Sequence, residues 1–107
     1  MSLRKKQSKF ARMIADLILY AYENGYELTF GHAYRCQDCK VGMANSLHKV
    51  RLAVDLNLFR DGRYLTSTDD YHPLGVFWES LDQKCAWGGR FTKPDGNHFS
   101  MEHDGRK

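Results

Sequence analysis

The stretch SLHKVRLAVDLNLF, residues 46–59, combines a strand pattern with two polar residues that the pattern does not explain. Branched apolar side chains occupy alternate positions from Leu52 to Leu58, which is typical of a strand with one buried face. Asp55 stands in mid-strand on the opposite face, where aspartate is disfavoured, and His48 precedes the strand. A residue that opposes the local preference without local benefit indicates a function. The stretch therefore predicts both a central strand and part of a polar site.

Around this strand, the sequence predicts a small α+β domain with an antiparallel sheet and flanking helices. The apolar spacing in the first quarter of the chain indicates an amphipathic helix that ends at Asn24–Gly25. Asp61–Gly62 is typical of a hairpin turn, and Asp69 or Asp70 is expected to cap the second helix. The expected elements are a helix over 7–23, a strand within 26–34, a loop over 36–47, a hairpin over 51–68, a helix from about 72 and a strand over 97–102.

Size and composition point to one globular domain. We expect a single domain over residues 1–107, because this length is near the commonest domain size and can enclose one modest core. Hydrophobic residues make up 42% of the chain and aromatic residues 13%, which excludes a disordered protein. The net charge of +3 is mild, so we expect no nucleic-acid partner.

The sequence also bears on location. Three cysteines are an odd number, which argues against a full disulfide framework and favours synthesis in a reducing cytoplasm. Arg12 and Asp16 interrupt the apolar run that follows the basic N-terminal segment, so we expect neither a signal peptide nor a membrane-inserted helix.

Two histidines and two aspartates have the composition of a catalytic zinc site. Such a site needs three protein ligands and an open position, with a carboxylate nearby that takes a proton from water. His48, Asp55 and His98 would supply two imidazoles and one carboxylate, and Asp95, three residues before His98, would be the spare acid. The alternative is that these residues are ordinary polar side chains that flank strands.

Three segments resemble a known family. Ser46-x-His48-x(6)-Asp55 resembles the first motif of the peptidoglycan-cleaving zinc peptidases. These comprise the D-alanyl-D-alanine metallopeptidases, their vancomycin-resistance relatives and the phage L-alanyl-D-glutamate endolysins. DGNHF, with Asp95 and His98, resembles the second motif, and FGHAYR, which ends at Arg35, resembles the earlier Tyr-Arg segment. The segments follow the family's order.

The resemblance implies a hedgehog-like fold and Zn²⁺ bound by His48, Asp55 and His98. It also implies that Asp95 is the general base that activates water and later protonates the leaving amine. Two departures from the family pattern stand out. Arg51 occupies a position where the family usually has glycine, and Asn97 occupies one where many relatives have tryptophan.

For substrate binding, the resemblance implies that Arg35 polarises the scissile carbonyl or holds a substrate carboxylate, a task that suits its planar side chain. Ser46 would hydrogen-bond the substrate or a ligand. The residues themselves leave two roles open for Trp87, in the loop WGGRF: a core residue, or an aromatic wall of the substrate groove. Glu102 remains an alternative base, and His103 an alternative third ligand.

The leading interpretation is a monomeric zinc peptidase of phage or prophage lysis type that cleaves peptidoglycan stem peptides. We expect it to be made in the host cytoplasm and to reach the wall after release. The bond cleaved is L-alanyl-D-glutamate or D-alanyl-D-alanine. One alternative is a metal-stabilised, nucleic-acid-associated phage protein built on Cys36 and Cys39, with Cys85 or His32 as further ligands. Another is a catalytically inactive relative of the peptidases.

Overall fold

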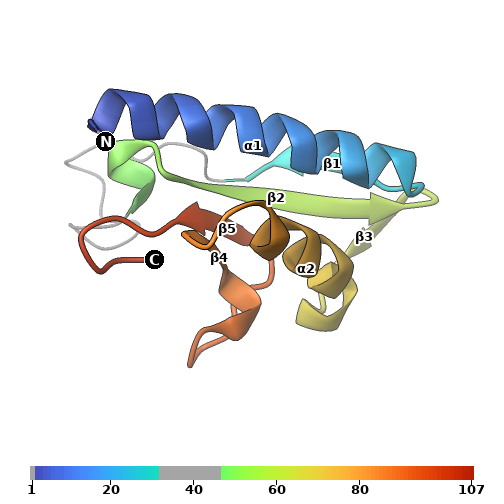
Figure 1. The fold of residues 1–107 in the computed structure, drawn as a ribbon. Coiled ribbons are helices and arrows are strands. Elements are labelled where there is room, and N and C mark those ends of the chain that lie inside the picture. Colours follow the sequence, from blue (N-terminus) through green and yellow to red (C-terminus); the bar gives the residue numbers. More distant parts are fainter. Residues whose placement is uncertain (1, 32–46) are drawn as a thin grey trace.

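The computed structural model describes residues 2–31 and 47–107, except for the side chains of residues 48 and 49. Two helices pack with a small antiparallel sheet, and α1 runs along the length of β2 (Figure 1). The elements are α1 (Leu3–Glu23), β1 (Glu27–Phe30), β2 (Ala53–Arg60), β3 (Arg63–Leu65), α2 (His72–Leu81), β4 (Cys85–Trp87) and β5 (His98–Met101), with the 3-10 helices η1 (Leu47–Val50), η2 (Thr68–Tyr71) and η3 (Gly88–Arg90). The predicted α+β class is confirmed.

The sheet has the strand order β1-β2-β5-β4, and β3 pairs with the C-terminal end of β2. All of these pairs are antiparallel, and β5 lies between β2 and β4. In the β2–β5 register Asp55 lies opposite His98, and Val54 lies opposite Phe99. Directly opposed residues of antiparallel strands project from the same face. The register therefore places Asp55 and His98 together on one face of the sheet.

The other face of the sheet forms the core with both helices. Phe10 of α1 contacts Trp78 of α2 edge to face at 5.7 Å, and Trp78 contacts Phe99 of β5 at 6.2 Å. The Trp78 indole N–H donates to the main-chain oxygen of Ser100 at 3.0 Å, which satisfies its one polar atom inside the core. Leu56 and Leu58 are buried, so the predicted apolar face of the central strand is confirmed.

Several element boundaries differ from the prediction. The first helix begins at Leu3, because the Ser2 side chain accepts a hydrogen bond from the Lys5 N–H and caps it. The expectation that Asp69 or Asp70 caps the second helix is wrong. Ser67 instead caps η2, with the Asp70 carboxylate accepting from the Ser67 N–H. The part of the first predicted strand beyond Gly31 lies outside the described residues, as does nearly all of the predicted loop.

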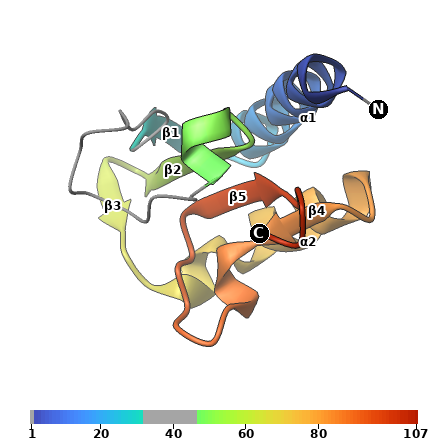
Figure 2. The ribbon, with the colours of Figure 1, turned by 90° about the vertical axis from the view of Figure 1, so that its left-hand side faces the viewer.

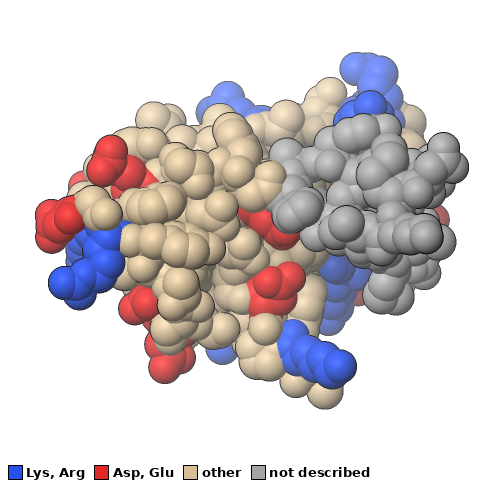
Figure 3. Space-filling view, turned by 180° about the vertical axis from the view of Figure 1, so that it is seen from behind, with Lys and Arg blue, Asp and Glu red and all other residues tan. Residues whose placement is uncertain are grey.

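The surface agrees with the mild net charge. Acidic and basic side chains are mixed on the face seen in Figure 3, so the described part of that face carries no extended patch of one sign. Among the described residues, no helix is both long enough and apolar enough to cross a bilayer.

Candidate metal centre

Asp55 is held rigidly inside β2. Its main-chain oxygen accepts a hydrogen bond from the Gly31 N–H at 2.7 Å, and only 5% of the residue is exposed. The alternation of β2 directs its neighbours Val54 and Leu56 into the core and leaves the carboxylate on the opposite face. The strand pattern thus predicts the direction of this side chain correctly.

His98 begins β5 and lies across from Asp55. It is 8% exposed, and its Nδ1 lies 3.5 Å from Asp55 Oδ1. The ring of Phe91 lies 5.3 Å from the imidazole ring and covers part of it. Two polar side chains with metal-ligand chemistry are therefore almost entirely removed from water.

Asp95 approaches the pair from the loop between η3 and β5. Its N–H donates to the main-chain oxygen of Gly88 at 2.9 Å, and its own main-chain oxygen accepts from the His98 N–H at 3.1 Å. A Cβ at Gly88 would collide with the Asp95 main-chain oxygen and come within 2.8 Å of His98 Cβ. Glycine at this position therefore allows the loop to pack directly against the start of β5. The Asp95 side chain itself is exposed.

These three residues form a cluster that fits a metal ion. One candidate ligand atom from each of Asp55, Asp95 and His98 lies within 4.8 Å of the others. Tetrahedral zinc with ordinary Zn–N and Zn–O distances separates a nitrogen from an oxygen ligand by roughly 3.4 Å. The separation of 3.5 Å between His98 Nδ1 and Asp55 Oδ1 matches that value. Carboxylate and imidazole donors are also those that zinc accepts.

The other residues predicted from the family motifs lie mostly outside the described part of the chain. His48 belongs to η1, immediately before β2, but its side chain is outside the described residues. Arg35 and Ser46 are outside them entirely. The roles predicted for these three residues stay predictions.

Trp87 is almost entirely buried, with 2% of its surface exposed. Its indole N–H donates to the main-chain oxygen of Gly96 at 2.7 Å, which fastens the loop that carries Asp95. Its predicted contact with substrate stays a prediction, and the structure adds a role in holding the loop. A hollow beside Trp87 and Phe91 is lined further by Arg90, Lys84 and Lys107.

The alternative candidates lie elsewhere. Glu102 is 3.9 Å from Lys84, and His103 is 3.2 Å from Lys6, both away from the cluster of Asp55, Asp95 and His98. Cys36, Cys39 and His32 lie outside the described residues.

Cys85, the remaining candidate for a cysteine-based metal site, belongs to the core. It donates to Met13 Sδ at 3.8 Å, and burial raises the pKa of its thiol to about 12. Because metal binding requires the thiolate, this environment disfavours Cys85 as a ligand.

Sequence reasoning missed two features near the cluster. The Asn97 side chain donates to Asn57 Oδ1 at 3.2 Å, which adds a link between the β5 loop and β2. The main-chain oxygen of Lys107 lies 3.2 Å from His98 Nε2. Asp104–Gly105 is a turn signal that could have indicated a chain reversal there.

The comparisons with known proteins agree with this geometry. Residues 40–101 match a family model of the peptidase class, described as D-alanyl-D-alanine carboxypeptidase. The chain belongs to this family of metallopeptidases, peptidase family M15. The suspected family is confirmed, and the chain is a peptidase that acts on peptidoglycan. No curated protein matches the chain.

A solved structure shares the fold. The L-Ala D-Glu endopeptidase ChiX of Serratia marcescens superposes with a TM-score of 0.71 at 19% sequence identity. The match covers 89% of this chain and 79% of that protein. It confirms the predicted fold type.

Proposed function

We propose that the protein is a zinc-dependent endopeptidase that hydrolyses the L-alanyl-D-glutamate bond of peptidoglycan stem peptides. The observation that carries the proposal is the convergence of Asp55, Asp95 and His98 within 4.8 Å, in a chain of this peptidase family. The structural match to the L-Ala D-Glu endopeptidase ChiX suggests this bond, and the description of the matching family model, D-alanyl-D-alanine carboxypeptidase, names the alternative bond that the test must separate.

The three residues differ in solvent exposure, which suggests that they have different roles. Asp55 and His98 are buried and fixed by β2 and β5, which suits permanent ligands, and His48 is the proposed third ligand. Asp95 is exposed at the edge of the cluster, where it can meet both solvent and substrate. When bound, zinc supplies Lewis-acid chemistry: it polarises the scissile carbonyl and lowers the pKa of water.

Asp95 then performs the proton transfers. Its carboxylate takes a proton from the attacking water and returns it to the leaving amine as the peptide bond breaks. Arg35 is proposed to stabilise the developing negative charge on the carbonyl oxygen, and Ser46 to hydrogen-bond the substrate. Fixed ligands beside an accessible base are what water-mediated hydrolysis of a peptide needs.

We propose a lysis role for the enzyme, as an endolysin of phage or prophage type. In this proposal the monomeric protein accumulates in the host cytoplasm and reaches the wall only after release. The basis is sequence alone: the resemblance of the Ser46–Asp55 stretch and of DGNHF to motifs that the phage endolysins share, and the odd number of cysteines.

The test is mass analysis of purified peptidoglycan after incubation with the protein, with and without a chelator. We expect the glycan-linked part of the stem to end in L-alanine with a free carboxyl group. This product should disappear when the chelator removes the metal. Asp95→Asn should lower the cleavage rate roughly a hundred- to ten-thousand-fold, because the general base is lost. The variant should still bind about one zinc ion per chain, because its ligands remain.

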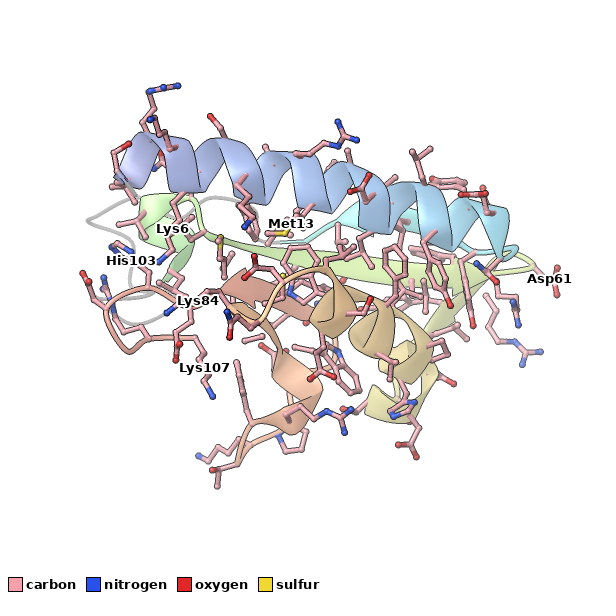
Figure 4. The ribbon with its side chains drawn as sticks, viewed as in Figure 1. Lys6, Met13, Asp61, Lys84, His103 and Lys107 are labelled. Atoms are coloured by element: carbon pink, nitrogen blue, oxygen red, sulfur yellow. The ribbon has the colours of Figure 1, made fainter. Side chains whose placement is uncertain are left out.

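Two comparisons make the result specific. Asp61→Asn changes an acid in the turn between β2 and β3, at the far end of the molecule (Figure 4), and should leave the rate unchanged. His48→Ala should lose zinc, whereas joint replacement of Cys36 and Cys39 by serine should keep it. Zinc that depends on the cysteines, or no chelator-sensitive product, would contradict the proposed function.

A further inference from the structure

The last described residues form a tight hairpin that returns the chain toward β5. The His103 N–H donates to the Arg106 oxygen at 2.9 Å, and the Arg106 N–H donates to the His103 oxygen at 2.9 Å. Asp104 and Gly105 between them have φ of +51° and +76°. Positive φ at both central residues is the signature of a type I′ turn. We call residues 103–106 the terminal hairpin.

A contact with α1 holds the terminal hairpin in place. Lys6 Nζ lies 3.2 Å from His103 Nδ1, and because ammonium is only a donor, the lysine donates to the ring. Figure 4 shows Lys6 and His103 at the same end of the molecule, with Lys84 and Lys107 below them. The hairpin is therefore docked on the first helix and directs the next residue toward the metal centre.

That next residue reaches His98. The main-chain oxygen of Lys107 lies 3.2 Å from His98 Nε2. A main-chain oxygen only accepts, so Nε2 must carry the proton and donate it. In the neutral imidazole the lone pair then belongs to Nδ1, the atom that faces Asp55 Oδ1 at 3.5 Å. One contact thus determines which ring nitrogen can serve as a ligand.

We propose that the main-chain oxygen of Lys107, held by the terminal hairpin, is a positioning group that fixes the tautomer and ring orientation of His98. The proposal rests on the proposed function in one respect, that His98 is a metal ligand. Histidine ligands generally donate their second ring N–H to a carboxylate or carbonyl oxygen, and loss of that partner typically weakens metal binding ten- to a hundredfold. Here the partner comes from the main chain rather than from a side chain.

The direct test compares the chain ended at Arg106 with the chain ended at Lys107. Competition with a chromophoric chelator should show zinc binding about ten- to a hundredfold weaker for the shorter chain. Lys107→Ala keeps the main-chain oxygen and should bind zinc within about twofold of the parent. The ¹⁵N spectrum of His98 in metal-free protein should show one Nε2–H tautomer in the longer chain and a tautomer mixture in the shorter one.

A second pair of variants tests the hairpin without removing residue 107. Gly105 and Gly62 both have φ of +76°, both follow an aspartate, and a Cβ at either would meet no atom within 4 Å. Alanine at either position is strained alike, but only Gly105 leads to His98. Gly105→Ala should weaken zinc binding, and Gly62→Ala should not.

The outcomes separate the two proposals. If the parent chain binds no zinc at His98, the proposed function fails, but the His98 tautomer still tests the contact with Lys107. If the shorter chain keeps both the parent's tautomer and its zinc affinity, the positioning role is wrong. If Lys107→Ala is as defective as the shorter chain, the lysine side chain acts instead of the main-chain oxygen, and the proposal is also overturned.

Discussion

At the scale of single residues, Arg51 departs from the family motif at a position where the backbone has an unusual conformation. It lies between η1 and β2 with φ of +58°, in the left-handed region that glycine adopts without penalty. The family that this motif resembles usually has glycine here, and glycine would adopt this conformation without the cost that a side chain adds. The turn that connects the predicted ligand His48 to β2 is therefore strained in this protein.

Arg51→Gly should relieve this strain. The left-handed conformation costs a non-glycine residue roughly 1–2 kcal/mol, and glycine offsets part of the gain through its greater freedom in the unfolded chain. We expect the free energy of unfolding to rise by up to about 1 kcal/mol, measured by urea denaturation of the metal-free protein. Arg51→Ala keeps the strain and should show no such increase. Equal effects of glycine and alanine would show that the side chain, not the backbone, matters.

At the scale of elements, much of the site could be predicted because two strands carry it. The alternation from Leu52 to Leu58 indicates which way Asp55 points, and DGNHF marks the start of β5. The β2–β5 register could not be predicted, since pairing between segments distant in sequence depends on the assembled core. β4 has only three residues, too few for a period to be recognised. The contact of Lys107 with His98 could not be predicted either. It is made by the main-chain oxygen, which every residue has, so the residue type at position 107 gives no indication of it.

The loop from η3 to β5 gives a prediction at this scale. Gly88→Ala would drive a methyl group into the Asp95 main chain and against His98 Cβ, so the loop must move. Overpacking of this kind typically costs about 1–3 kcal/mol. We expect weaker zinc binding and at least a tenfold loss of peptidase activity in protein that is still folded by circular dichroism. Unchanged zinc affinity in folded Gly88→Ala would show that the loop does not position the cluster.

At the scale of the whole molecule, the long helix α1 links distant parts of the chain. The helix makes apolar contacts with α2. It also carries Lys9, whose Nζ lies 2.6 Å from Oδ2 of Asp82, at the end of α2. The Lys9 hydrogen bond, together with the Lys84 N–H, holds the pKa of Asp82 below its ordinary value. The same helix holds the terminal hairpin through Lys6. Figure 2 shows the end of the chain beside β5 and β4.

This ion pair makes stability depend on pH in a defined direction. Because the folded pKa of Asp82 is lowered, its contribution is complete above the unfolded value near 4 and is lost as pH falls through the folded pKa. At pH 7 Asp82→Asn should destabilise the protein by about 1 kcal/mol, and the difference should vanish in strong acid. Asp16→Asn, which breaks an exposed pair with Arg12, should change stability little at either pH. A constant difference across pH would exclude the charge as its cause.

The strand order has a consequence for the synthesis of the protein on the ribosome. β5 is the last described strand in sequence, yet it lies between β2 and β4 in the sheet. A nascent chain that has not yet released β5 from the ribosome therefore carries β2 with one edge incomplete, a surface that can pair with other chains. Asp55 also has no His98 beside it at that stage. Insertion of one strand thus closes the sheet and assembles the site together, so interrupted synthesis leaves an inactive, aggregation-prone fragment rather than a partly active peptidase.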